Sequence, residues 1–180
     1  MSADALTRLQ ELLREAGGLM ATLLDPGPVD GAAHRSVPSP ATVAAEGPRA
    51  QGRREEYELL VEAIYEGYLL HYGSPRVLCT PEADLGLLAG DQLYAIGLAR
   101  LVGLGDTLAV AELADTITLS ALAQGAGEPA LAAAVWAAGA RAVGWGSSVA
   151  HGRAKDLAFA GAPEAIEAMR TSALGAPEPH

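Results

Sequence analysis

Residues 80–102 constrain the fold of this chain most, because this stretch is long enough for an extended helix and is almost entirely apolar. Thr80 is a favourable N-cap residue, and Pro81 suits the first helical position, where its missing N–H costs nothing. The sequence therefore predicts a long apolar helix here, around which the rest of the chain packs.

Three glycines share one side of this predicted helix. Gly86, Gly90 and Gly97 recur at helical spacing together with Leu93 and Leu101. Each glycine gives up roughly 1 kcal/mol of helix propensity. We therefore expect another element or molecule to approach this side of the helix closely.

Asp91 interrupts the same apolar helix and is the first candidate for chemistry. It lies on the face of Asp84, among Leu87, Leu88 and Tyr94. A carboxylate among leucines must be paired, hydrogen-bonded or protonated. An ordinary hydrogen bond between helices and a functional site both produce such a placement, so both roles are open for Asp91.

The composition favours an all-α chain of one domain. Of the 180 residues, 50% are hydrophobic but only 4% are aromatic, so Leu and Ala, which favour helix, must fill the core. The net charge of −10 argues against nucleic acid as a partner, because nucleic acid requires clustered positive charge. The single cysteine, Cys79, excludes an internal disulfide.

We expect a cytoplasmic chain with no membrane span. The N-terminal residues carry scattered charges and no continuous apolar run, so they do not predict a secretory signal. The most apolar later stretch, residues 130–150, consists largely of Ala and Gly and includes Arg141. A spanning helix needs about 20 strongly apolar residues, so this stretch predicts a buried helix instead.

Composition divides the chain into an arm, a linker and a helical body. Residues 1–24 predict an amphipathic arm helix that docks on the body or on a partner. Residues 25–52 are rich in Pro, Gly, Ala and Ser, which predicts a flexible linker. Residues 53–174 predict an all-helical domain, and residues 175–180 a disordered tail. The body helices expected are residues 56–72, 80–102, 106–124, 129–150 and 164–172.

The residues alone predict no catalytic or metal-binding motif. The 4 histidines share no ligand spacing. Ser147 and Ser148 follow glycines but lack the G-x-S-x-G spacing and a preceding strand. A run of glutamates could hold a cation, although its spacing and the arginines beside it favour a solvated helix face. The run comprises Glu55, Glu56, Glu58, Glu62 and Glu66.

Three segments resemble the polyprenyl diphosphate synthase family. Residues 71–73 (HYG) are similar to a turn that ends a helix in that family, and residues 87–95 (LLAGDQLYA) are similar to its Leu-Ala-Gly-Asp helix. Residues 140–148 (ARAVGWGSS) resemble the small-residue helix before the second aspartate-rich motif. The likeness covers residues 56–157, and it implies a helical bundle resembling part of the isoprenoid synthase fold.

The aspartate motifs of active members are absent from this sequence. In active members two such motifs coordinate Mg²⁺, which holds the allylic diphosphate. Glu58, Glu62 and Glu66 stand on the helix that should bear the first motif, and His151 and Gly152 stand where the second belongs. The resemblance is therefore nearest to the non-catalytic small component of two-component heptaprenyl diphosphate synthases.

This resemblance implies a partner subunit. A catalytic prenyl synthase subunit would supply Mg²⁺ and the diphosphate sites, while this chain, with no metal, cofactor or catalytic residue of its own, would help to shape an apolar channel. The product would serve menaquinone side chains, and the partner could hold the chain at a membrane. The candidate interface or prenyl-channel face comprises Gly86, Gly90, Asp91, Tyr94 and Gly97.

Two other functions remain open. The chain could be a structural or adaptor subunit that a linker tethers to an arm helix bound in a larger complex. It could also be a self-sufficient prenyltransferase that uses glutamates in place of the aspartates, which predicts turnover by the isolated chain.

Overall fold

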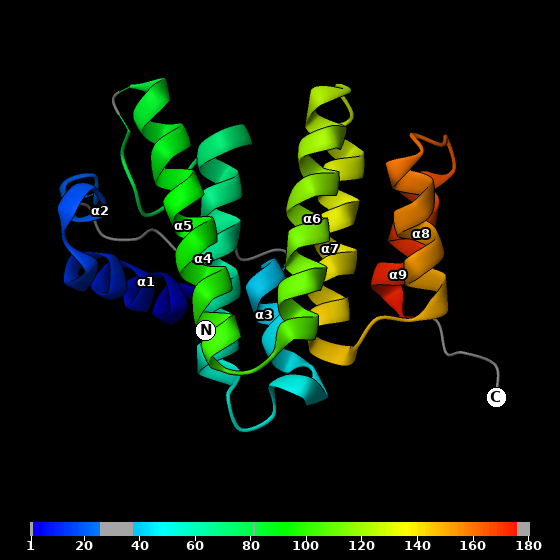
Figure 1. The fold of residues 1–180 in the computed structure, drawn as a ribbon, viewed down its shortest axis with the longest axis horizontal. Coiled ribbons are helices and arrows are strands. Elements are labelled where there is room, and N and C mark those ends of the chain that lie inside the picture. The colour runs from blue at the N-terminus through cyan, green and yellow to red at the C-terminus, as the bar shows by residue number, and fades with distance from the viewer. Residues whose placement is uncertain (1, 26–37, 81, 176–180) are drawn as a thin grey trace.

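The computed structural model describes residues 2–25, 38–80 and 82–175, and within these ranges the chain is helical (Figure 1). The predicted all-α class is confirmed. The described residues include no strand, and one isolated bridge joins Leu24 to Leu78. That bridge joins the end of the N-terminal segment to the connector that follows the helix Arg54–Tyr72.

From the helix Pro40–Glu46 onward, short connections join one helix to the next. They are α1 (Ser2–Ala16), α2 (Gly18–Thr22), α3 (Pro40–Glu46), the 3-10 turn η1 (Pro48–Ala50), α4 (Arg54–Tyr72), α5 (Ala83–Gly103), α6 (Thr107–Gly125), α7 (Pro129–Trp145), α8 (Val149–Phe159) and α9 (Ala165–Leu174). The helix α4 packs along α5, and α6 packs along α7. The helix α3 bridges α4 and α7, while α8 and α9 lie beyond α7 at the end of the molecule away from α5 (Figure 1).

Three apolar clusters hold these layers together. The central cluster joins α3, α4, α6 and α7 around Ile64, Leu113 and Trp136. A second cluster lies under α1 and α2, where Leu9 and Met20 pack on α4 and α5. The third lies among α6, α7, α8 and α9. Alanines fill much of the third cluster, which lets its helices approach closely.

The N-terminal arm is docked on the body. Leu6, Leu9 and Leu13 of α1 are buried, and they belong to the same cluster as Leu93 of α5. The predicted single arm helix is interrupted at Gly17, which has a φ of 69° and is the N-cap of the short α2. The arm therefore covers one side of α4 and α5.

The predicted flexible linker over residues 25–52 is wrong for residues 38–52. Ser39 caps α3 by accepting a hydrogen bond from the Thr42 N–H, and residues 40–50 pack into the core through small side chains. The buried members are Ala41, Ala44, Ala45 and Ala50. Residues 26–37 of the predicted linker, and residues 176–180 of the predicted tail, lie outside the described residues.

Two predicted helix boundaries also need correction. The long apolar helix begins at Ala83 with Glu82 as its N-cap, and not at Thr80. The helix that starts at Pro129 ends at Trp145, because Gly146 takes a φ of 94° that helical residues do not adopt. Ser148 then caps a separate helix, α8, which the prediction of one helix over residues 129–150 missed.

Asp106 is the N-cap of α6, at the start of the helix predicted over residues 106–124. Its carboxylate accepts hydrogen bonds from the Ala109 N–H at 3.0 Å, from Arg49 at 2.6 Å and from the Tyr57 hydroxyl at 2.5 Å. Burial alone would raise the pKa of Asp106, but these donors outweigh it and lower the pKa. Burial and the same carboxylate raise the pKa of Tyr57 to about 12. Asp106 therefore joins η1, α4 and the start of α6.

Candidate functional site

The glycine face of α5, formed by Gly86, Gly90 and Gly97, is covered by α4 at Gly90 and Gly97, whereas Thr80 of the preceding connector lies nearest to Gly86. A Cβ built on Gly97 would lie 2.4 Å from the side chain of Ile64, and one on Gly90 would lie 2.3 Å from Nε2 of His71. All three glycines are buried. The close approach that the glycines indicate is therefore made by α4 and the connector of the same chain, and a role for them at a partner interface or prenyl channel stays a prediction.

Asp91 lies on the opposite, solvent-exposed side of α5. Its side chain is 71% exposed, and Oδ1 is 3.5 Å from Nε2 of His71. That ring nitrogen also donates to the carbonyl oxygen of Leu87 at 3.0 Å. Asp91 shares this side with Leu87 and Leu88 as predicted, but these leucines are 50% and 58% exposed, so the carboxylate lies in solvent and not in an apolar interior.

Tyr94 lies between the two sides of α5. It is partly buried against the central cluster, and its ring centroid is 5.3 Å from that of His71 in an edge-on arrangement. Burial raises the pKa of its hydroxyl, so Tyr94 is neutral at physiological pH. Of the five candidate residues, only Asp91 and part of Tyr94 can therefore meet another molecule in this conformation.

The exposed side of α5 is unusually apolar. We define the α5 outer face as the apolar residues exposed along one side of the helix together with Asp91, namely Leu87, Leu88, Asp91, Ala95, Ala99 and Val102; the exposed Asp84 and Gln92 lie beside them. A single exposed leucine is ordinary, whereas several apolar residues exposed along one side of a helix are typical of an interaction surface. Among the described helices, α5 alone has the length and hydropathy of a membrane span, a test that core helices of soluble proteins also pass.

Of the five glutamates predicted to form a solvated face, Glu55 and Glu56 are exposed as expected, but the other three form a buried row. Glu58, Glu62 and Glu66 lie one turn apart and are at most 5% exposed. Arg76 reaches Glu62 and donates to Glu66 Oε2 at 3.0 Å. The backbone N–H groups of Arg76 and Val77 donate to Glu66 Oε1 at 2.5 and 2.8 Å. The row thereby fixes the connector between α4 and α5.

The same glutamate row also binds α1 and the start of α3. Arg8 of α1 donates to Glu58 at 3.2 Å, and the Thr42 hydroxyl donates to the other oxygen of Glu58 at 3.2 Å. Ser39 donates to Glu62 at 3.2 Å. Burial raises the pKa of Glu62 even though Arg76 and Ser39 oppose the shift. These carboxylates are therefore occupied by donors of the chain itself.

A second polar network connects α6, α8 and α9. The buried imidazole of His151 is 2.6 Å from Glu112 through Nε2 and 2.7 Å from the Ser172 hydroxyl through Nδ1. Lys155 donates to the other oxygen of Glu112 at 3.0 Å and to Asp115 at 2.7 Å. The sequence analysis missed this network because its members are far apart in the chain. The one local indication was Glu112, a charged residue on an otherwise apolar helix face.

The order of serine, histidine and carboxylate also occurs in hydrolases, but the arrangement differs here. In those enzymes the serine bonds Nε2 and the carboxylate bonds Nδ1–H. In this chain the two nitrogens have exchanged partners, and the charge of Glu112 is already balanced by Lys155. We interpret the network as a structural connection that holds α8 and α9 on α6.

Glu112→Gln is expected to lower the free energy of unfolding by about 2 kcal/mol at pH 7, because it removes a buried charge-assisted bond. Burial alone would raise the pKa of Glu112, but His151 and Lys155 outweigh it and lower the pKa. A lowered folded pKa stabilises the fold above the unfolded value of 4.5, and this contribution is lost as the pH falls further. Urea unfolding between pH 7 and pH 3.5 should show the difference shrink toward the acid end.

The matched control for that measurement is Glu167→Gln, because the Glu167 side chain is 75% exposed. It should change stability by less than about 0.5 kcal/mol at every pH. A Glu112→Gln difference that grows toward acid pH would contradict the lowered pKa.

The chain matches no protein-family model, no curated protein and no solved structure.

Proposed function

We propose that this chain is a non-catalytic helical subunit that binds a catalytic polyprenyl diphosphate synthase and supports isoprenoid side-chain synthesis. The α5 outer face carries the proposal. Leu87, Leu88 and Val102 are between 50% and 58% exposed along one side of a helix whose other side is already packed. Burial of the exposed half of a leucine contributes on the order of 1 kcal/mol, so a partner helix laid along this face gains several such contributions.

A hollow beside the same face favours a protein partner. It has a volume of about 420 Å³ and lies between the ends of α4 and α5, where Leu59, Leu60 and Ala99 line it. Protein interfaces commonly seat an anchor side chain of the partner in such a hollow. A helix that follows the α5 outer face toward its C-terminal end could place an apolar anchor there.

The buried glutamate row supports a helper role over a catalytic one. A carboxylate binds Mg²⁺ through its free oxygens, and the metal must remain accessible to diphosphate. Glu62 and Glu66 have fully buried side chains and both contact Arg76, so their oxygens already serve the fold. This occupation by an arginine argues against the self-sufficient prenyltransferase that uses glutamates.

Co-expression with the catalytic prenyl synthase subunit of the same genome tests the proposal. We expect the two chains to elute together in size-exclusion chromatography, and Mg²⁺-dependent chain elongation to rise when this chain is present. Leu88→Asp should weaken the complex at least about tenfold, because it places a charge in an apolar contact. Leu174→Asp is the control, since Leu174 is 84% exposed at the end of α9, away from α5.

The same co-expression experiment distinguishes a non-catalytic synthase subunit from a structural adaptor subunit. Recovery with an unrelated complex, with no effect on elongation, would favour a helical adaptor subunit. Turnover by the isolated chain would overturn both.

A further inference from the structure

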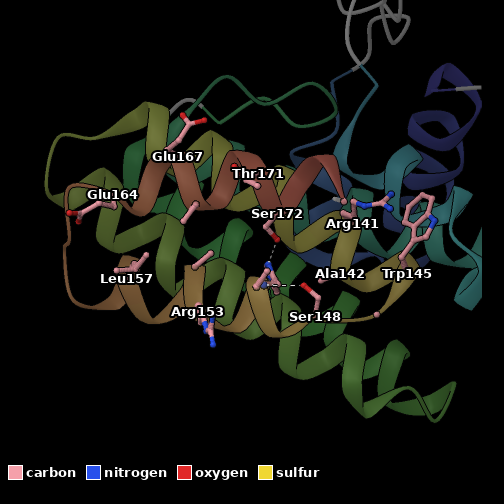
Figure 2. Close-up of a pocket in the computed structure, with 17 residues that line it drawn as sticks. Arg141, Ala142, Trp145, Ser148, Arg153, Leu157, Glu164, Glu167, Thr171 and Ser172 are labelled. Atoms are coloured by element: carbon pink, nitrogen blue, oxygen red, sulfur yellow. Dashed lines mark hydrogen bonds between the residues drawn. The ribbon is translucent and has the colours of Figure 1, made fainter. Parts of the chain in front are cut away.

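A cleft of about 770 Å³ lies among α7, α8 and α9, far from the α5 outer face (Figures 1 and 2). Small-molecule sites in proteins commonly have volumes of roughly 300–1,000 Å³. Much of the wall of this cleft is apolar and offers no side-chain hydrogen bonds, as at Ala138, Ala142, Ala154, Leu157 and Ala168. The cleft therefore suits the apolar body of a ligand.

Arg141 provides the cleft with a cation that pairs with no carboxylate among the described residues. Its guanidinium carbon lies 4.4 Å from the ring centroid of Trp145, and within the described part of the chain no hydrogen bond or ion pair engages it. The other described cations of similar partial burial each have a carboxylate partner. They are Arg8, Arg49, Arg76 and Lys155.

Charge is distributed unevenly along the cleft. Arg141 and Trp145 lie together at one end, Glu164 and Glu167 lie toward the other end, and Arg153 of α8 also lines the cleft between them (Figure 2). An anionic group is therefore attracted to the Arg141 end and repelled from the far end. Other arginines without an ion pair among the described residues, such as Arg100 and Arg153, are exposed, whereas Arg141 is partly buried.

We propose that this cleft binds a small amphipathic carboxylic acid, with its carboxylate on Arg141 and its apolar body along the alanine-rich wall. A single guanidinium presents a planar pair of donors that matches one carboxylate. Arg153 also lines the cleft, but Glu164 and Glu167 repel any additional negative charge on a head group. The apolar body gains by leaving water against Leu157 and the alanines.

Titration calorimetry with three probes of equal chain length tests the site on the intact protein. Octanoate should bind at least about tenfold more tightly than 1-octanol or octylammonium, because only octanoate forms the charge-assisted pair with Arg141. Equal affinities for the three head groups, or no octanoate binding at millimolar concentration, would overturn the proposal. This comparison needs no variant, so it does not depend on how a substitution affects folding.

Arg141→Gln should weaken octanoate binding at least about tenfold and leave 1-octanol binding unchanged. The matched control is Arg100→Gln, because Arg100 is exposed on α5 and does not line this cleft. Octanoate affinity that survives in Arg141→Gln would contradict the assignment of the head group. The cleft and the α5 outer face are separate. Octanoate binding can therefore be measured even if the chain binds no synthase subunit, and binding of the subunit can be measured even if octanoate does not bind.

Discussion

Replacement of Arg76 by Met is expected to lower the free energy of unfolding by about 3–5 kcal/mol. Arg76 contacts both Glu62 and Glu66, whose side chains are fully buried. Removal of one partner from a buried ion pair leaves an uncompensated charge, which costs more than the pair itself contributes. Burial alone would lower the pKa of Arg76, but the two carboxylates outweigh it and raise the pKa, so the cation is present at every accessible pH.

Neutralising the two glutamates should restore much of the loss. In the triple variant Arg76→Met with Glu62→Gln and Glu66→Gln, none of these three buried charges remains, and the side-chain oxygen of residue 66 can still accept from the backbone N–H groups of residues 76 and 77 that Glu66 now binds. We expect the triple variant to be more stable than Arg76→Met alone. Urea unfolding followed by circular dichroism measures both values.

Arg100→Met is the control for the arginine, because Arg100 is exposed and lies outside the glutamate row. It should change stability by less than about 0.5 kcal/mol. A loss of under about 1 kcal/mol in Arg76→Met would mean that the glutamate row is not the clamp that the contacts indicate.

The glutamate row shows why burial of charge is hard to predict from local pattern. Charged residues at helical spacing beside arginines usually indicate a solvated face. Here the partners that make burial tolerable are Arg76, Thr42 and Arg8, which come from three other segments. A pattern within one helix carries no information about donors that arrive from elsewhere in the chain.

Helix existence was easier to predict than helix ends and packing. Amphipathic or apolar runs with capping residues are local signals, and they identified α1, α4, α5, α6, α7 and α9. The break before α8 was missed because residues 146–148 interrupt the pattern only briefly. The segment of α3 was missed because its alanines become core only against α7 and α4.

The candidate site was predicted only in part. The glycines on α5 correctly indicated a close approach, but the nearest atoms belong to α4 and to Thr80 of the same chain. The exposed apolar side of the helix was not foreseen, because a helix that is apolar all round gives no local sign of which side is covered. That distinction depends on where α4 packs, which is a tertiary property.

Gly47→Ala is expected to lower the free energy of unfolding by about 3 kcal/mol. Gly47 has a φ of −70°, which alanine adopts without strain. In a flexible linker the change would therefore be neutral, or would stabilise by about 0.4–1 kcal/mol through the unfolded state. In the structure, however, an added Cβ would lie 2.1 Å from the carbonyl oxygen of Gly144. Because the opposing atom is backbone, only separation of residue 47 from α7 relieves the contact.

Gly144→Ala approaches the same contact from the other side, since its Cβ would lie 2.6 Å from the carbonyl oxygen of Ala44. It should destabilise as Gly47→Ala does, and the double variant should cost less than the sum of the two, because one separation relieves both contacts. Gly103→Ala is the control, because no atom lies within 4 Å of its added Cβ and helical alanine is favoured by up to about 1 kcal/mol. Thermal and urea unfolding of the four variants measure the change in the free energy of unfolding. A loss of stability in Gly47→Ala would show that residues 38–52 pack in the core, whereas a gain would show that they form a flexible linker.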